Sequence, residues 1–265
     1  MTNAPIGIFD SGIGGLTVFR SIAEQLPGYD YIYLGDNSRA PYGNRSFNTI
    51  HQYTWECVQW LFKMDCQLVI LACNTASAKA LRTIQQNDMQ GLDSSKRVLG
   101  VIRPTAEVIG DLSQTKEIGV LGTTGTVQSG SYPIEIKKFF PDLKVYQQAC
   151  PLWVPLIESG EYEKAGSDYL IKQYLDEIMA QSANIDTLLL ACTHYPLLLD
   201  HLNRIAPWPV AWIDPAPAIA RRVVGLIGDH QPGVPHGDAV LLYTSGKRHA
   251  WPETLAPFFG GQVAA

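Results

Sequence analysis

The chain has 265 residues, of which 46% are hydrophobic and 17% charged, and its formal net charge is −5. A chain of this length can bury roughly 70–75% of its unfolded surface, so its core needs no disulfide or metal to hold it together. No basic run is longer than a pair such as Lys96-Arg97, which argues against nucleic acid as the primary partner. No apolar run approaches the roughly 18–20 residues that span a bilayer, and the N-terminus lacks the pattern of a secretion signal. We therefore expect a cytoplasmic protein that makes no use of a membrane.

Five cysteines stand at positions 57, 66, 73, 150 and 192. Their odd number and wide spacing argue against a disulfide framework, and also against a zinc site, whose ligands come in closely spaced pairs. In a reducing cytosol they are expected to be free thiols, and no metal is predicted.

The first strand, residues 6–9, ends in a glycine-rich turn that leads into a helix ending near residue 26. Unpaired N–H groups at such a turn can hold an anion, although a plain tight turn is more common. The turn reads Gly12-Ile13-Gly14-Gly15, which lacks the G-x-G-x-x-G spacing of a dinucleotide site. We therefore expect no NAD.

Residues 31–34 are predicted to form a second strand, and residues 35–44 a loop rich in Pro, Gly and Asn that is long enough to cover a site. Apolar residues at helical spacing follow, and they place Cys57 on the buried stripe of a helix. Cys66 falls in the short connector after that helix. We expect both thiols to be structural.

The apolar run at residues 68–72 is the feature around which the chain is organised, because it ends in Cys73. Such runs are typical of strands buried on both faces, and the carboxyl ends of these strands are where open α/β sheets bind ligands. A helix is predicted from Asn74 to about residue 86. A thiol at a helix N-terminus is expected to have a lowered pKa.

The second half continues the alternation of strand and helix. Strands are predicted at 98–101, 118–121, around 145, at 187–191, 210–213 and 239–243, and helices at 104–111, 166–181, 197–205 and 216–227. Residues 148–160 are predicted to be a loop, in which Cys150 is structural. The strand at 187–191 ends in Cys192.

The exit Ala191-Cys192 repeats the exit Ala72-Cys73, and the segment that begins at Ile118 repeats the one that begins at Ile6. We interpret this as a weak internal duplication of an α/β unit, with two strand ends facing each other across one cleft. The fold class is therefore α/β, with two pseudo-symmetric doubly wound domains, mainly parallel sheets, and the active site between them.

Four blocks also carry a resemblance to a known family. They are residues 9–18 (FDSGIGGLTV), 35–43 (GD through PYG), 72–76 (ACNTA) and 191–197 (ACTHYPL). Together, in this order, they resemble the glutamate racemases, the cofactor-independent type with two cysteines. The resemblance covers about residues 5–245. It departs from the family pattern at Ala191, where glycine is common, and in the segment around Arg103, which leaves regulation and subunit packing open.

The resemblance implies that the C-terminal strands return to the first half of the chain. Domain one would then be 1–97 plus 208–265, carrying Asp10 and Cys73, and domain two 98–207, carrying Thr123, Cys192 and His194. It also implies the activity. Racemisation next to a carboxylate removes a proton from one face and returns one to the other, which suits two opposed thiols, each with an unperturbed pKa of about 8.5.

The same resemblance implies roles for individual residues. Cys73 and Cys192 are the catalytic pair, with Asp10 near Cys73, and with His194 and Glu161 near Cys192. Glu158 is an equally placed glutamate three residues earlier, so the choice between the two stays open. A function for Asp36 is as plausible as ordinary loop capping. In the substrate-binding set, Asp10 and Ser11 with help from Thr193 would bind the ammonium, Asn74 and Thr75 with Thr126 or Thr123 the α-carboxylate, and Tyr42 and Gly43 the side-chain carboxylate. His194 belongs to the same set.

The predicted partner is a small molecule, L- or D-glutamate, with no cofactor, and the product D-glutamate would supply peptidoglycan synthesis. Trp208, Trp212 and Trp251 exceed what a lone domain needs to expose, and the family commonly forms homodimers, so a homodimer is expected. The alternatives are an aspartate or hydantoin racemase, a Cys–His thiol hydrolase, and a non-catalytic amino-acid-binding protein on the same scaffold.

Overall fold

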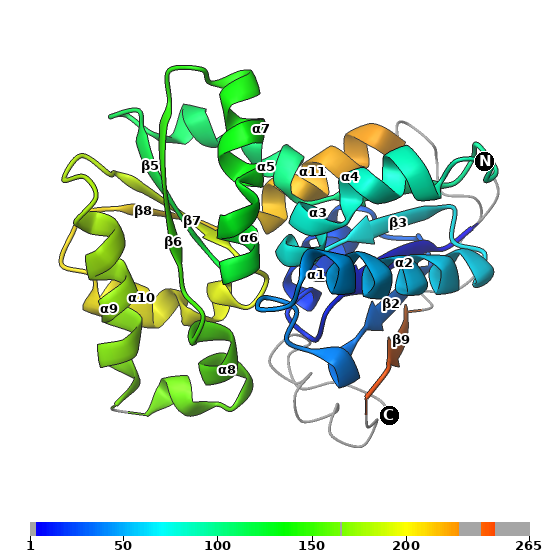
Figure 1. The fold of residues 1–265 in the computed structure, drawn as a ribbon, viewed down its shortest axis with the longest axis horizontal. Helices are drawn as coiled ribbons and strands as arrows, with labels where there is room; N and C mark the ends of the chain where they lie inside the picture. Colours follow the sequence, from blue (N-terminus) through cyan, green and yellow to red (C-terminus); the bar gives the residue numbers. More distant parts are fainter. Residues whose placement is uncertain (1–3, 165, 228–239, 247–265) are drawn as a thin grey trace.

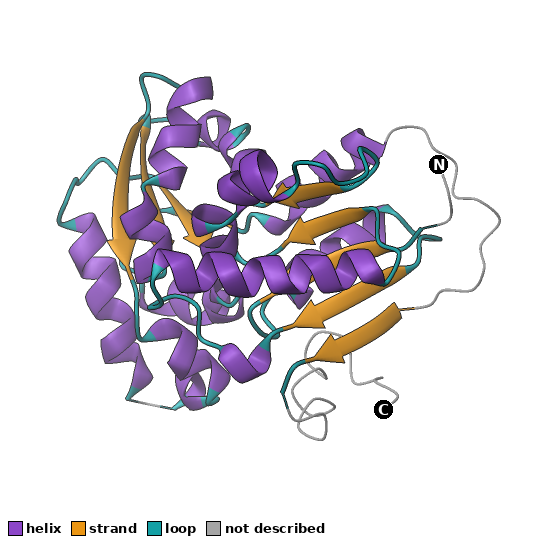
Figure 2. Cartoon of the chain, turned by 45° about the vertical axis from the view of Figure 1, so that its right-hand side comes forward, coloured by secondary structure: helices purple, strands orange, loops and turns teal. Residues whose placement is uncertain are grey.

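The computed structural model describes residues 4–164, 166–227 and 240–246. Two lobes lie side by side, and each is a parallel sheet with helices on both faces (Figures 1 and 2). The first lobe contains the strands coloured blue and cyan in Figure 1, and the second contains those coloured green and yellow. The predicted fold class is confirmed.

Four strands of the first sheet have the same order as the four strands of the second when the second is read from its other end, and the first sheet has a fifth strand at one edge. The first sheet runs β4-β3-β1-β2-β9 and the second runs β6-β5-β7-β8, with every paired neighbour parallel. The strands of the first sheet are β1 (Ile6–Asp10), β2 (Tyr31–Gly35), β3 (Leu68–Leu71), β4 (Arg97–Gly100) and β9 (Val240–Thr244). Those of the second are β5 (Glu117–Gly122), β6 (Lys144–Ala149), β7 (Thr187–Ala191) and β8 (Ala211–Ile213). Thus β3 beside β1 corresponds to β7 beside β5, as the sequence repeat predicts.

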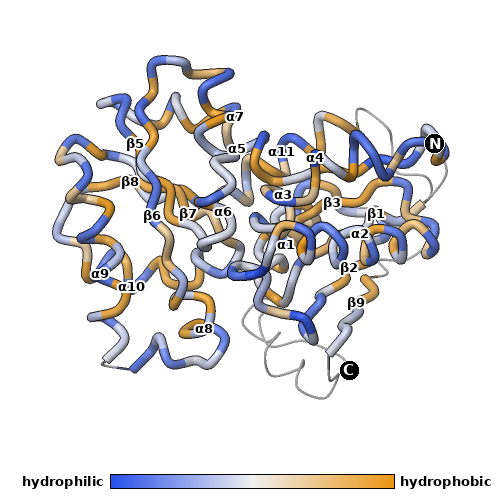
Figure 3. Tube along the Cα trace, viewed as in Figure 1, coloured by the Kyte–Doolittle hydropathy of each residue, from blue (hydrophilic) through white to orange (hydrophobic). Residues whose placement is uncertain are grey.

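Helices cover the sheets because the central strands carry apolar side chains on both faces. The hydropathy colouring marks β3 and β7 as largely hydrophobic (Figure 3). In β1, Ile8 faces a core formed with α1 and α11, whereas Phe9 faces the core under α2. The helices of the first lobe are α1 (Leu16–Gln25), α2 (Phe47–Lys63), α3 (Asn74–Lys79), α4 (Leu81–Thr83) and α11 (Ala216–Ile227). Those of the second are α5 (Ile102–Ala106), α6 (Thr124–Ser129), α7 (Ser131–Phe139), α8 (Trp153–Glu158), α9 (Ser167–Met179) and α10 (Leu199–Ile205).

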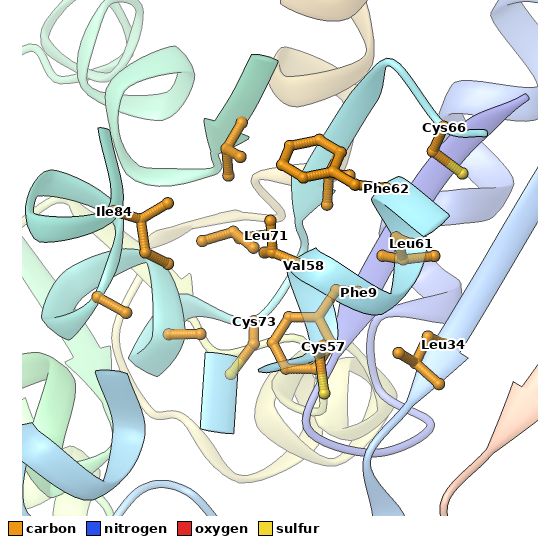
Figure 4. Close-up of a cluster of buried hydrophobic side chains, with 14 of the residues drawn as sticks. Phe9, Leu34, Cys57, Val58, Leu61, Phe62, Cys66, Leu71, Cys73 and Ile84 are labelled. Carbon is orange, nitrogen blue, oxygen red and sulfur yellow. The ribbon is translucent and has the colours of Figure 1, made fainter. Parts of the chain in front are cut away.

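Cys57 and Cys66 lie in the apolar core under α2, together with Phe9 (Figure 4). Burial raises the pKa of each thiol to about 12. The prediction that Cys57 is a core residue on a helix stripe is confirmed.

Sheet membership differs from the predicted boundaries at 97/98 and 207/208. The strand β4 pairs with β3 in the first sheet, although residues from 98 onward were assigned to the second unit. The strand β8 pairs with β7 in the second sheet, although residues from 208 onward were assigned to the first. Both β4 and β8 are edge strands, and the apolar pattern of a strand does not show which of the two sheets it will join. The return of β9 to β2 follows the expected course.

Several helices also differ from their predicted extent. The helix predicted from Asn74 to about residue 86 is divided into α3, α4 and a π-helical turn at Ile84–Asp88. The helices α6 and α7 were not predicted, and α8 lies inside the predicted loop 148–160. Among the described residues, no helix combines the length and the apolar character that crossing a membrane requires.

Candidate active site

The carboxyl ends of the central strands of both sheets open onto one cavity between the lobes. Ten of the residues predicted for the site line it: Ser11, Tyr42, Gly43, Cys73, Asn74, Thr75, Thr123, Cys192, Thr193 and His194. Asp10 and Thr126 lie directly behind this lining, hydrogen-bonded to members of it. The cavity thus combines strand ends that are far apart in the sequence, at the place where open α/β sheets bind ligands.

Cys73 follows β3 and is the N-cap residue of α3. Its thiol is buried and donates a hydrogen bond to the Ser11 hydroxyl at 3.5 Å. Burial raises the pKa of Cys73 to about 12, and the nearby Asp10 adds to this, while Ser11 and the Ala76 N–H in the first turn of α3 lower it. The predicted effect of the helix N-terminus is therefore present, but burial outweighs it. Cys73 is a thiol at neutral pH in this state.

Asp10 is the last residue of β1, directly before the glycine-rich turn. Its Oδ2 accepts a hydrogen bond from the Gly12 N–H at 2.9 Å, and its Oδ1 accepts one from the Thr193 hydroxyl at 3.4 Å. Burial raises the pKa of Asp10, although the neighbouring His194 opposes this. The turn does offer N–H groups to an anion, and this anion is the chain's own carboxylate.

Cys192 follows β7, and its sulfur lies 3.9 Å from His194 Nδ1. The other ring nitrogen, Nε2, donates to Glu158 Oε1 at 3.1 Å. Burial disfavours the charged imidazolium, but the hydrogen bonds to Cys192 and Glu158 outweigh it and raise the pKa of His194 to about 10. Near neutral pH, therefore, the second thiol lies beside a cation, whereas the first lies beside the carboxyl group of Asp10.

Glu158, not Glu161, is the glutamate that contacts the histidine beside the second thiol. It ends α8 one turn after Val154, and both line the cavity. Glu161 lies in the following 3-10 turn and pairs with Lys164 at 2.5 Å. Its prediction as a catalytic neighbour is corrected accordingly. Pro155 made the segment resemble a loop, yet proline is tolerated in the first turn of a helix, which is where it lies.

Hydroxyl groups connect the two lobes at the other end of the cavity. The oxygens of Thr75 and Thr123 lie 2.9 Å apart. Thr123 caps α6 by accepting the Thr126 N–H at 3.2 Å, and the Thr126 hydroxyl lies 3.1 Å from that of Thr123. Thr126 is fully buried and orients Thr123 from behind.

The loop of residues 35–44 is anchored by Asp36, whose role the sequence left open. The buried Asp36 carboxylate accepts the Tyr42 hydroxyl at 2.5 Å, the Arg39 Nε–H at 2.6 Å and the Ser245 hydroxyl at 2.6 Å. The Tyr42 hydroxyl is therefore occupied, and Tyr42 and Gly43 offer the cavity a ring and backbone groups. Asp36 holds the loop that carries them.

Glycines let the lobes touch around the cavity. A Cβ on Gly14 would lie 2.5 Å from His194 Nδ1 and 2.6 Å from Thr193 Oγ1. A Cβ on Gly43 would lie 2.9 Å from Thr123 Cβ, and the Gly43 carbonyl accepts the Gly125 N–H at 2.8 Å. Any side chain at these positions would push the two lobes apart.

Cys150 is a third thiol in the cavity lining, beside Val154. Burial raises its pKa well above the ordinary value, and its sulfur makes a weak contact with the Gln148 carbonyl oxygen at 3.8 Å. That partner is a backbone group, whereas Cys73 and Cys192 lie beside an acid or a base. Within the described residues, no three His, Cys, Asp or Glu side chains are grouped so as to hold a metal ion.

Comparison with known proteins identifies the family to which this chain belongs. The family described as Asp/Glu/Hydantoin racemase matches residues 6–223. A glutamate racemase of Sulfurihydrogenibium sp. is 45% identical over 204 residues, which cover 77% of this chain and 75% of that protein. The solved glutamate racemase isoform RacE1 of Bacillus anthracis superposes with a TM-score of 0.89 at 32% identity, covering 98% of this chain and 96% of that one. The chain belongs to the glutamate racemase family.

A second solved relative bears on the ligand. The glutamate racemase of Francisella tularensis, solved in complex with D-glutamate, has a TM-score of 0.85 and 30% identity, covering 97% of this chain and 94% of that one. The resemblance inferred from the four sequence blocks is thus confirmed, and the enzyme class is isomerase.

Proposed function

We propose that this chain interconverts L- and D-glutamate with two bases: one of Cys73 and Cys192 removes the α-proton, and the other supplies a different proton to the opposite face. The observation that carries the proposal is the placement of two thiols at equivalent strand ends, opening onto one cavity from opposite lobes. One thiolate takes the proton from Cα, and the thiol on the opposite side gives its proton to the other face. After each turnover the thiolate and the thiol have exchanged places, so no atom or charge is gained or lost.

The neighbours of each thiol suit this exchange. Asp10 and Ser11 flank Cys73, while His194, supported by Glu158, flanks Cys192. Because Cys73 has a pKa of about 12, it must lose its proton to act as a base, and the approaching substrate ammonium would favour its thiolate. On the other side, His194 Nδ1 lies 3.9 Å from the sulfur of Cys192, within reach for a proton to pass between them.

Neutral donors surround the position of the α-carboxylate. Asn74, Thr75 and Thr123 line one end of the cavity. Among the described residues that line the cavity there is no arginine to bind a carboxylate. Preorganised donors stabilise the charge that develops in the transition state, typically by about 2.7–4 kcal/mol for one donor. The ammonium would lie near Asp10, Ser11 and Thr193, and the side-chain carboxylate near the backbone of residues 42–43.

Three wider expectations belong to the same proposal. The two lobes act as domains that close on the substrate, the first formed around β1 and the second around β5. The protein works in the cytoplasm as a homodimer, and its D-glutamate supplies the cell wall. Trp208 and Trp212 support the dimer less than the sequence suggested, because they are half-buried against the core of the second lobe. Trp251 lies outside the described residues.

The test is racemisation of L-glutamate by the purified protein with no added cofactor, followed by circular dichroism and by α-proton exchange in deuterated water. Racemisation with exchange of the α-proton supports the proposal. Binding of glutamate without exchange would identify an amino-acid-binding protein instead. A preference for aspartate or a hydantoin over glutamate would identify another branch of the wider family.

A further inference from the structure

A buried hydrogen bond connects the second lobe to the residue that follows Cys73. Tyr132 lies in α7 and is fully buried, and its hydroxyl donates to Asn74 Oδ1 at 2.6 Å. The preceding residue, Ser131, donates from its hydroxyl to the Ala78 carbonyl of α3 at 3.2 Å. The start of α7 therefore holds α3, and with it the peptide that carries Cys73, from across the interface.

The other end of the Asn74 amide has no partner among the described residues. Asn74 is 2% exposed and lines the cavity, and its Nδ2 is buried without a hydrogen bond from the protein. A carboxamide accepts through its oxygen and donates through its nitrogen, so whatever binds the oxygen determines which way the nitrogen points. A buried donor of this kind carries a desolvation cost unless a ligand satisfies it.

Tyr132 is suited to hold the amide in one orientation. Burial raises the pKa of Tyr132, so its hydroxyl keeps its proton near neutral pH and remains a donor. A phenol that donates to Oδ1 leaves the two N–H bonds of Asn74 directed away from α7. The ring lies in the apolar core with Ile102 and Ile136, which fixes the position of the hydroxyl.

We propose that Tyr132 is a positioning residue that acts through Asn74. Its hydroxyl holds the Asn74 amide so that the NH₂ group faces the cavity and donates to a carboxylate of the substrate. This inference rests on the proposed racemase function. Because Tyr132 belongs to the second lobe and Asn74 to the first, the donor is correctly oriented only while the two lobes are in contact. Lobe closure and carboxylate recognition are thereby coupled at the residue next to the first thiol.

The test is a double-mutant cycle on kcat/KM for glutamate, with Tyr132→Phe, Asn74→Ala and the combined variant. Tyr132→Phe retains the ring and removes only the hydroxyl. We expect it to lower kcat/KM about tenfold in the otherwise unchanged protein, as the loss of one oriented hydrogen bond would. In the Asn74→Ala background the same change should have no further effect, because the residue through which it acts is gone.

Tyr31→Phe is the matched control. It removes another buried tyrosine hydroxyl, which donates to the Leu26 carbonyl at 2.8 Å in the first lobe, and Tyr31 is not among the residues that line the cavity. It should leave kcat/KM unchanged. If Tyr132→Phe lowers kcat/KM by the same factor with and without Asn74, or leaves it unchanged in both, the inference is wrong. If the wild-type protein itself fails to racemise glutamate, the proposed function fails first.

Discussion

The two thiols occupy the same place in two similar sheets, yet their chemical surroundings differ. Cys73 follows β3, which lies beside the central strand β1, and Cys192 follows β7, which lies beside the central strand β5. Burial and a carboxylate raise the pKa of Cys73, whereas Cys192 lies against an imidazolium that Glu158 supports. The matching strand order of the two sheets thus gives the two thiols equivalent positions, as a reaction on two faces needs. The side chains beside each thiol differ.

The two half-sites also depend on each other's lobe. Thr193 of the second lobe donates to Asp10 of the first, and Gly14 of the first lobe packs directly on His194 of the second. Neither thiol has a complete environment within its own lobe. We therefore expect changes at the interface to affect both directions of the reaction.

The largest effect is expected from the thiols themselves. Serine is a poor base at neutral pH, so Cys73→Ser and Cys192→Ser should each lower the rate of racemisation by roughly 10²–10⁴-fold. Cys150→Ala is the control, because Cys150 lines the same cavity and its weak contact is with a backbone carbonyl. It should leave the rate within a few-fold of wild type. A loss at Cys150 as large as that at Cys192 would contradict the assignment of the pair.

The next largest effect is expected at the contact between the lobes. Gly14→Ala places a Cβ 2.5 Å from His194 Nδ1, so the imidazole or the whole lobe has to move. A displacement of about 1 Å in a catalytic group can cost about 10²-fold in rate, and we expect a loss of that order in both directions. Gly225→Ala is the control, because a Cβ there meets no atom within 4 Å. A Gly14→Ala enzyme with wild-type kcat/KM would show that the described contact is not needed for turnover.

A smaller loss is expected when the carboxylate behind His194 is neutralised. Glu158→Gln replaces a charged acceptor at 3.1 Å by a neutral one. A hydrogen bond to a charged group contributes about 1.5–3 kcal/mol. Glutamine retains part of this interaction, so we expect kcat to fall about tenfold. Glu161→Gln, which removes only an exposed pair with Lys164, should have no measurable effect. The reverse ranking of the two variants would restore the assignment made from the sequence.

The smallest effect is expected in the pH dependence of stability. The pKa of His194 is raised in the folded protein from 6.5 to about 10, so the native state binds this proton more tightly than the unfolded state does. The resulting stability is fully present below pH 6.5 and is lost as the pH rises toward 10. Urea unfolding of wild type should show this decline, and Glu158→Gln should show less of it. Equal slopes for the two proteins would argue that Glu158 does not raise the pKa of His194.

The sequence predicted the strands that end at the two cysteines, because a long apolar run closed by small polar residues is typical of a buried strand and its exit. It also placed Cys57 in the core, since helical spacing alone decides this. It named Glu158 but could not choose it over Glu161, because Pro155 conceals the short helix that Glu158 ends. Nor did it identify Tyr132, because a buried tyrosine on a helix has the same local pattern whether its hydroxyl binds a functional residue or fills the core.

The most direct test of the two opposed thiols uses elimination rather than racemisation. Loss of HCl from a glutamate with chloride on the β carbon needs only one base, so each single mutant can still perform it on one enantiomer. The family resemblance implies that Cys73 removes the α-proton of D-glutamate and Cys192 that of L-glutamate. Cys73→Ser, which retains the thiol of Cys192, should therefore release chloride from the L enantiomer, and Cys192→Ser should release it from the D enantiomer. Opposite preferences would establish one thiol on each face of the substrate. If both mutants prefer the same enantiomer, the two thiols do not act from opposite faces, and the proposed mechanism is wrong.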